Sequence, residues 1–344
     1  MSTGVVKKPP IGYNRHMNWD LIGHEWAVHL LKEHILKENL RHAYLFTGPQ
    51  GTGRRTLALH LAQALNCPQP IAPGEACGTC STCTRITRMQ YTDLNIVKTE
   101  PGRSKLVVDQ VRELQHTLAL APYEGHYRIA VLLRFEEANP SAANALLKTL
   151  EEPNPQVIII LTANSAENLL PTIVSRCEVL RLGLLPIEVV STGLQEKYNL
   201  PAEKAQFLAH LSNGRPGYAI SLHQQPELLE QRRSWLVDLE RMNVSNRLER
   251  FEYAEILTKD KDKTRFVLQI WVSFWRDVML CASGLTTPIT NTDYVNEINR
   301  LANIIPLAKA YQIVSALEKC INQLDINVNI RLAIEVLLLD LPYL

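Results

Sequence analysis

The stretch HAYLFTGPQGTGRRTLALHLAQALN, residues 42–66, combines three different local patterns. Its first part, HAYLFTG, is a short apolar run that ends in glycine, which is typical of a buried strand entering a turn. Its last part, RRTLALHLAQALN, has apolar residues at helical spacing. The stretch therefore predicts a strand, a glycine-rich loop and a helix, the unit from which parallel α/β domains are built.

The loop of this unit resembles one that binds phosphate, but it lacks key residues. Such a loop needs glycines whose N–H groups wrap the anion, a lysine for the outer phosphates and a hydroxyl for Mg²⁺. Here Arg54 stands at the lysine position and Arg55 at the hydroxyl position, and a guanidinium cannot ligate Mg²⁺. A degenerate nucleotide loop and a purely structural turn both remain open. The candidate nucleotide-contacting residues are Gly48, Gly51, Gly53, Arg54, Arg55 and Thr56.

A hydrolytic site also needs an acidic pair at the end of a neighbouring strand, to orient Mg²⁺ and activate water. The apolar run IAVLL, residues 129–133, is followed by Arg134, and Glu136 and Glu137 come later. A shift of two or three residues aims a side chain elsewhere. We therefore expect the two glutamates to lie on a solvated turn, outside any hydrolytic site.

Further strands and helices alternate along the first half of the chain. This alternation predicts a parallel sheet covered by helices on both faces. The predicted strands are residues 94–98, 127–133, 157–163 and 178–182, and the predicted helices are residues 107–120 and 141–152, the second ending at Pro153.

Four of the seven cysteines fall in one short segment, CPQPIAPGEACGTCSTC, residues 67–83. Two overlapping C-x2-C pairs and an upstream cysteine suit a closed tetrahedral zinc site. Four free surface thiols would be a reactivity liability. The segment therefore predicts a structural zinc module with Cys67, Cys77, Cys80 and Cys83 as ligands. Cys281 and Cys320 lie in helical patterns and are expected in the core.

Beyond Pro186 the strand signal ends and the pattern is helical. Residues 187–213 predict about two helices that stop at NGRPG, and long amphipathic helices follow, including residues 266–281 and 329–341. We predict an α/β domain over residues 1–184 with the zinc module inside it, a helical lid over residues 185–224 and an all-α collar over residues 225–344.

The composition excludes several classes of protein. Apolar residues make up 46% of the 344 residues and charged residues 21%, with a net charge of +1. These values are typical of a folded soluble protein and provide no overall field to attract nucleic acid or anionic lipid. The N-terminus has no apolar signal core, and no stretch approaches the roughly 18 apolar residues of a membrane span. We expect a cytoplasmic protein.

Two long strings carry a family resemblance. SAANALLKTLEEP, residues 141–153, and LLPTIVSRCEVLRL, residues 169–182, resemble the AAA+ subunits of bacterial DNA polymerase III clamp loaders, the tau/gamma and delta prime proteins. WDLIGHE, residues 19–25, and NIRLAIEVLLLDL, residues 329–341, extend the resemblance, which is weakest between residues 228 and 328. The resemblance implies an AAA+ P-loop-type α/β domain, a helical lid, and a collar through which five subunits form an open ring.

Within this family the chain is most similar to the delta prime branch, the stator, and departs from the motor branch. The motors need the loop lysine and hydroxyl, the acidic pair and a lid arginine; this chain has Arg54, Arg55, Leu133, Arg134 and Gly217 at the aligned positions. The resemblance implies a subunit without independent ATP hydrolysis. Nucleotide binding stays open, because some delta prime proteins keep a competent loop. The alternative is a tau/gamma-like or autonomous AAA+ ATPase with atypical motifs.

One functional motif of the family is intact. Arg176 lies in SRC, and the resemblance implies an arginine finger that reaches the γ-phosphate of ATP in a neighbouring subunit. A guanidinium there neutralises charge that develops on the transferred phosphoryl group. The alternative is a local ion pair, for example with Glu178. Thr162 and Asn164 fall near the nucleotide-sensing strand end of the family.

The resemblance also implies partners. They are the tau/gamma and delta subunits of the ring and, through the complex, the sliding clamp and primer-template DNA. A third hypothesis is a zinc-dependent DNA-binding protein. The near-neutral charge argues against it, because binding to DNA by a lone chain relies on phosphate neutralisation.

Overall fold

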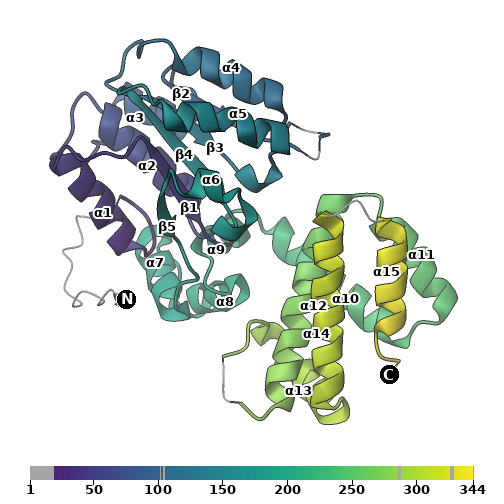
Figure 1. Cartoon of the computed structure of the whole chain (residues 1–344). Helices are drawn as coiled ribbons and strands as arrows, with labels where there is room; N and C mark the ends of the chain where they lie inside the picture. The colour runs from purple at the N-terminus through teal and green to yellow at the C-terminus, as the bar shows by residue number, and fades with distance from the viewer. Residues whose placement is uncertain (1–18, 101, 104, 286–287, 326–328, 344) are drawn as a thin grey trace, which may run out of the picture. The chain divides into compact units, whose positions relative to one another are not determined.

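The structure is a computed structural model that describes residues 19–100, 102–103, 105–285, 288–325 and 329–343 (Figure 1). The N-terminal residues 1–18, for which no signal sequence is predicted, lie outside the described residues. The chain divides into two compact units, Met1–Leu184 and Leu185–Leu344.

The first unit contains a fully parallel five-stranded sheet, as predicted. Its strand order is β2-β3-β4-β1-β5, so β1 lies between β4 and β5. The loop that follows β1 therefore lies at the carboxyl edge of the sheet, between the ends of β4 and β5, and α/β sheets bind ligands at this edge. The strands are β1 (Ala43–Thr47), β2 (Leu94–Val97), β3 (Arg128–Leu132), β4 (Val157–Ala163) and β5 (Glu178–Arg181).

Helices cover both faces of this sheet (Figure 1). Successive side chains of β1 point to opposite faces: Tyr44 and Phe46 join one apolar core, whereas Ala43 and Leu45 join the other. Because β1 is buried on both faces of the sheet, its sequence is a continuous apolar run. The helices are α1 (Glu25–Leu36), α2 (Arg54–Asn66), α3 (Ser81–Thr87), α4 (Val108–Leu118), α5 (Pro140–Glu151) and α6 (Pro171–Val174), with 3₁₀ turns η1 (Phe135–Glu137) and η2 (Ala166–Asn168).

The second unit is helical, as predicted. The expected pair of helices in residues 187–213 is present as α7 and α8, and a third helix, α9, begins at Pro216. The lid and the collar fall in one unit, so their separation remains a prediction. The helices are α7 (Ile187–Tyr198), α8 (Ala202–Ser212), α9 (Pro216–Gln224), α10 (Glu227–Val244), α11 (Arg247–Leu257), α12 (Lys261–Ala282), α13 (Val295–Ile304), α14 (Leu307–Asp325) and α15 (Ile330–Asp340), with the 3₁₀ turn η3 (Thr292–Tyr294).

The core of the second unit centres on α12, whose Trp271, Phe274 and Trp275 are buried. Cys320 is buried in this core and Cys281 is partly buried against it. Within the described residues, none of the helices has the length and apolar character to cross a membrane.

Arg250 connects α11 to the end of the chain. Its buried guanidinium donates to the carbonyl oxygens of Leu338 (2.6 Å), Leu341 (3.1 Å) and Pro342 (3.0 Å) at the C-terminal end of α15. These carbonyls have no intrahelical donor of their own. Arg250 therefore acts as the cap of α15.

Replacing this cap should destabilise the second unit. We expect Arg250→Met to lower the free energy of unfolding by about 3 kcal/mol, because each buried acceptor left without a donor costs roughly 1–3 kcal/mol. Urea unfolding of the full chain measures the loss. Arg247→Met, at an exposed position of the same helix, is the matched control. Equal stability of the two variants would contradict the capping role.

Candidate functional site

The loop between β1 and α2 needs its glycines for the backbone conformation. Gly48, Gly51 and Gly53 have φ values of 143°, 89° and 102°, a region that side chains disfavour. The N–H of Gly48 points to the carbonyl oxygens of Ala163 (3.2 Å) and Asn164 (3.1 Å) at the end of β4. This donor is thus engaged by the protein itself.

Close packing explains two of the glycines without a ligand. A Cβ on Gly48 would lie 1.9 Å from the carbonyl oxygen of Leu182, and one on Gly53 would lie 2.9 Å from Cδ1 of Leu21. Beside the loop is a pocket of about 240 Å³. This volume is below the roughly 300–1,000 Å³ typical of ligand pockets.

Arg54, at the lysine position, turns into the domain. It is 7% exposed, and its Nη2 donates to Oδ1 of Asn164 (3.2 Å). The carboxylate of Glu136 accepts from the backbone N–H of Asn164 (3.2 Å). Burial lowers the pKa of Arg54 and raises that of Glu136, and the charge of each opposes the shift of the other. Nη1 of Arg54 and Oε2 of Glu136 are buried without a hydrogen-bond partner in the described structure.

The placement of Glu136 corrects the expectation of a solvated turn. Arg134 adopts a left-handed conformation, with φ of 52°, and its N–H donates to Oγ1 of Thr162 (2.9 Å). This bend turns η1 back toward β4, where Phe135 is buried and Glu136 is half-buried beside Arg54. No local sequence pattern predicts such a bend, because arginine rarely adopts a left-handed conformation.

The positions aligned with the acidic pair provide no carboxylate. Leu133 is half-buried, and the exposed side chain of Arg134 pairs with Glu137 (3.2 Å). The carboxylate of Glu137 also accepts from Oγ1 of Thr99 (2.5 Å). Glu137 is therefore engaged away from the loop.

The remaining predicted loop residues are not brought to Asn164. Arg55 and Thr56 are exposed on the first turn of α2. The buried hydroxyl of the loop belongs instead to Thr52, which donates to the carbonyl of Pro49 (2.9 Å). Sequence comparison with a phosphate loop gave no signal for Thr52, because that motif assigns no role to its position.

The four cysteines of residues 67–83 come together. Cys67 lies at the end of α2, Cys80 is the N-cap of α3, and Cys83 lies in the first turn of α3. Backbone N–H groups of Cys80 and Thr79 point at the sulfur of Cys77 and lower its pKa to about 6.

The spacing of the sulfurs matches a tetrahedral metal site. Cys67 lies 3.5 Å from Cys77 and 4.0 Å from Cys80, and Cys77 lies 3.9 Å from Cys83. All four sulfurs lie within 4.8 Å of one another. A zinc ion with Zn–S bonds of about 2.3 Å requires sulfur edges of about 3.8 Å. The donor set therefore fits zinc.

Arg176 follows α6 and is half-exposed. Its Nη1 donates to the carbonyl of Thr172 (2.8 Å), and its Nη2 pairs with Glu151 of α5 (2.7 Å). The local ion pair that the sequence left open as the alternative is therefore present, but its partner is Glu151 and not Glu178, which pairs with Arg41 (3.6 Å). An exposed ion pair of this kind contributes little to stability.

Within NGRPG, residues 213–217, an arginine lies two residues before Gly217. Gly217 lies in the first turn of α9 and has no side chain to offer. Nε of Arg215 donates to the carbonyl of Ser212 (2.8 Å), and its guanidinium lies 4.8 Å from the ring centroid of Tyr218. Arg215 is therefore engaged within the second unit.

Comparison with known proteins identifies relatives. The DNA polymerase III subunit delta' of Pseudomonas aeruginosa is 38% identical over 189 residues, covering 54% of this chain and 56% of that protein. The delta' subunit of Bacillus subtilis is 32% identical over 206 residues, covering 60% and 61%. The tau subunit of B. subtilis is 26% identical over 327 residues, covering 87% and 57%. The matches thus span little more than half the length of these relatives.

A solved structure of a DNA polymerase III gamma subunit-related protein from Thermotoga maritima has 17% identity and a TM-score of 0.44, covering 90% of this chain and 97% of that one. The α/β domain with a parallel sheet and the helical C-terminal region are as predicted. Residues 23–185 match the family described as DNA polymerase III, delta subunit, and residues 226–342 match its C-terminal family. The chain belongs to the DNA polymerase III delta subunit family.

Proposed function

We propose that this chain is the delta prime subunit, or stator, of a DNA polymerase III clamp loader. It assembles with tau/gamma and delta subunits in a five-membered ring that loads the sliding clamp on primed DNA, and it does not hydrolyse ATP by itself. The names of the delta' relatives support this assignment. The observation that carries the absence of hydrolysis is the inward position of Arg54 against Asn164 and beside Glu136.

Hydrolysis requires a carboxylate that is free to orient Mg²⁺ or water. Glu136 is the nearest candidate, but it is half-buried, holds the N–H of Asn164 and balances the charge of Arg54. The carboxylate of Glu137 accepts a hydrogen bond from Thr99 and pairs with Arg134, so it is also engaged. The loop between β1 and α2 thus keeps the glycine-rich form of a nucleotide site, but the charges of Arg54 and Glu136 neutralise each other.

Restoring the loop residues alone should therefore not restore hydrolysis. We expect the isolated chain to show no Mg²⁺-dependent ATP turnover, and the double variant Arg54→Lys, Arg55→Thr to remain inactive, because Leu133 and Arg134 still replace the acidic pair. A phosphate-release assay measures this, and Thr56→Ala, at an exposed position on the first turn of α2, should be equally inactive. Robust turnover by the unmodified chain would favour the autonomous ATPase instead.

The cysteine module would hold a structural zinc ion. Four thiolates fill a tetrahedral shell and leave no position for substrate or water. The ion would fix the segment between α2 and α3, with Cys67, Cys77, Cys80 and Cys83 as ligands. When bound it supplies a rigid cross-link and no catalytic chemistry.

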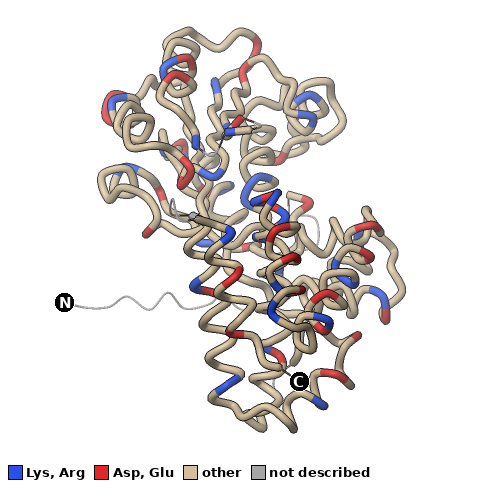
Figure 2. Tube along the Cα trace, turned by 90° about the vertical axis from the view of Figure 1, so that its right-hand side faces the viewer, with Lys and Arg blue, Asp and Glu red and all other residues tan. Residues whose placement is uncertain are grey.

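Residues of α15 suit assembly through the collar. Leu332, Val336 and Leu339 are exposed at spacings of four and three residues, the spacing of a helix seam that packs against another helix. We assign this face to contacts with the other ring subunits. Figure 2 shows Lys and Arg interspersed with Asp and Glu along the trace, which favours contact with DNA through the complex over binding by the lone chain.

Arg176 is the residue that we assign to catalysis in a neighbour. Its guanidinium would approach the γ-phosphate of ATP held by a motor subunit and neutralise charge in the transition state. The ion pair with Glu151 is solvent-exposed, so little free energy opposes its exchange for a phosphate.

A further inference from the structure

The first turn of α2 concentrates positive charge where a helix is already positive. Its first two residues are Arg54 and Arg55, the turn contains no acidic residue, and its N-cap, Gly53, has no side chain to cap it. The aligned peptide dipoles of a helix place a partial positive charge at its N-terminus, which an anion stabilises and a cation opposes. The start of α2 therefore requires a negative charge, either from another part of the chain or from a ligand.

Glu136 of η1 supplies this negative charge. Its carboxylate accepts from the N–H of Asn164 (3.2 Å), and Oδ1 of the same Asn164 accepts from Nη2 of Arg54 (3.2 Å). Burial shifts the pKa of Arg54 and of Glu136 toward the neutral form, and the opposite charge counters the shift of each. Asn164 thus holds the guanidinium and the carboxylate on either side of its own backbone and side chain.

Both charged groups keep one unused polar atom. Nη1 of Arg54 and Oε2 of Glu136 are buried and have no hydrogen-bond partner in the described structure. Arg54 as a whole is only 7% exposed. Because buried N–H groups normally have an acceptor, Arg54 is able to donate to one further oxygen. Phosphate oxygens are among the strongest acceptors for a guanidinium.

The neighbouring carboxylate of Glu137 does not share the role of Glu136. It pairs with Arg134 (3.2 Å) and accepts from Oγ1 of Thr99 (2.5 Å). The charge of Arg134 acts on Arg54 in the opposite sense to that of Glu136 and lowers its pKa. Glu136 is therefore the acid whose charge reaches Arg54.

The space beside the loop has room for phosphate groups. The pocket of about 240 Å³ is lined by Gly48, at the start of the loop, and by Asn164. It therefore adjoins the residue to which both charged groups are bonded. Its volume is below the roughly 300–1,000 Å³ typical of ligand pockets, so it suits a short chain of phosphate groups better than a complete nucleotide.

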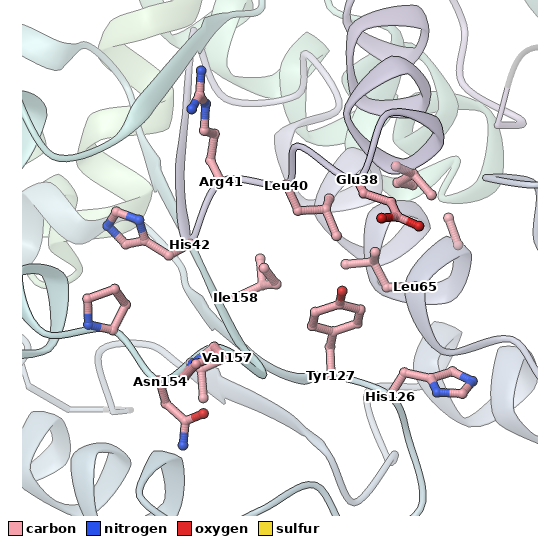
Figure 3. Close-up of a pocket in the computed structure, with 14 residues that line it drawn as sticks. Glu38, Leu40, Arg41, His42, Leu65, His126, Tyr127, Asn154, Val157 and Ile158 are labelled. Carbon is pink, nitrogen blue, oxygen red and sulfur yellow. The ribbon is translucent and has the colours of Figure 1, made fainter.

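The larger cavity of the first unit does not offer an alternative place for an anion. It has a volume of about 630 Å³ and lies at the amino edge of the sheet, among residues that precede β1, β3 and β4. Figure 3 shows the carboxylate of Glu38 on its wall and the guanidinium of Arg41 pointing away from its centre. Arg41 pairs instead with Glu178 (3.6 Å). We therefore expect an anion at the loop and not at this cavity.

We propose that Glu136 is an internal anion that takes the place of phosphate at the start of α2, and that removing its charge uncovers a site for polyphosphate. In the unmodified chain the carboxylate balances Arg54 and repels an approaching phosphate group. Without it, Arg54 and the start of the helix attract phosphate together. Glu136 thereby explains, within the proposed function on which this role rests, why the loop does not hold a nucleotide.

Titration calorimetry of the full chain with inorganic tripolyphosphate, in the presence of a chelator, tests this role. Glu136→Gln keeps an acceptor for the N–H of Asn164 and removes only the charge. We expect it to bind tripolyphosphate at least about tenfold more tightly than the unmodified chain. Glu137→Gln is the matched control, because it removes a neighbouring charge that is engaged by Arg134, and it should bind as weakly as the unmodified chain.

A second variant locates the site. Arg54→Met combined with Glu136→Gln should lose the gain in affinity, since the guanidinium that binds phosphate is then absent. Tripolyphosphate should also raise the thermal midpoint of Glu136→Gln and leave that of Glu137→Gln unchanged, because a ligand stabilises only the folded chain that binds it. This measurement reports on the site even if the single variant is less stable.

Three results would overturn the role of Glu136. They are equal affinity in Glu136→Gln and Glu137→Gln, a gain in affinity that survives Arg54→Met, and binding of tripolyphosphate or ATP by the unmodified chain as tight as that of Glu136→Gln. Failure of the proposed function is a separate result, namely Mg²⁺-dependent ATP turnover by the unmodified chain. The chelator prevents such turnover during the titrations, so they measure binding alone.

Discussion

Replacing Arg176 by alanine is expected to abolish ATP hydrolysis at one site of a reconstituted clamp loader. An arginine finger contributes about 10³–10⁵ in rate at the site that it serves. The amplitude of the hydrolysis burst that primed DNA triggers should therefore fall by the contribution of one site. The other sites should react at their usual rates. Rapid-quench measurement of the burst amplitude detects this loss, and gel filtration checks that the ring still assembles.

The surroundings of Arg176 provide matched controls. Glu151→Gln removes the partner of Arg176 in the isolated chain and should leave the burst amplitude at least as high as in the unmodified protein, because the guanidinium is then free to reach a neighbour. Arg181→Ala removes an exposed arginine of β5 that lies 3.9 Å from Glu167, and should change nothing. If Arg176→Ala also leaves the burst intact, Arg176 has no part in hydrolysis.

Removing one cysteine of the module is expected to abolish zinc retention. Apparent binding free energies of structural zinc sites are about 10–16 kcal/mol, and a site that loses one of four thiolates loses most of this affinity. We expect the unmodified chain to retain zinc after dialysis against a chelator and Cys80→Ser to release it. The thermal midpoint of the first unit should fall with the metal, because the proposed ion would link Cys67, at the end of α2, to Cys80 and Cys83 at the start of α3.

Atomic absorption and thermal unfolding of the same samples measure the two effects. Cys281→Ser is the control, since this thiol lies on α12 in the second unit, outside the cluster. It should keep the zinc content and the midpoint of the first unit. A chain that retains no zinc when produced in zinc-supplemented medium would contradict the metal assignment and leave the four thiols without a role.

The elements of the fold were largely predictable because their signals are local. The helix predicted at residues 54–66 and the strand predicted at residues 157–163 have these bounds in the structure. Both have strong signals: apolar residues at helical spacing in the first, and in the second an unbroken apolar run that is buried on both faces. The helix predicted over residues 107–120 is shorter, Val108–Leu118, because helix ends depend on capping and fray.

The site was predicted less completely because its geometry depends on contacts between distant segments. The sequence indicated that Arg54 replaces a lysine, but not that its guanidinium turns to Asn164, which is 110 residues away. It placed Glu136 on a solvated turn, since nothing local reveals the left-handed bend at Arg134. The ion pair of Arg176 with Glu151 likewise joins α5 to the segment after α6, which only the fold brings together.

Three features could be predicted without the fold: the alternation of strands and helices, the absence of an acidic pair after β3, and the set of four cysteines. These follow from residue type and spacing along the chain, which local sterics and burial translate directly into structure. The environment of each charge, by contrast, depends on the packing of segments that are far apart in sequence. The position of Arg54 against Asn164 and beside Glu136 is an example, because charge and burial act through space and not along the chain.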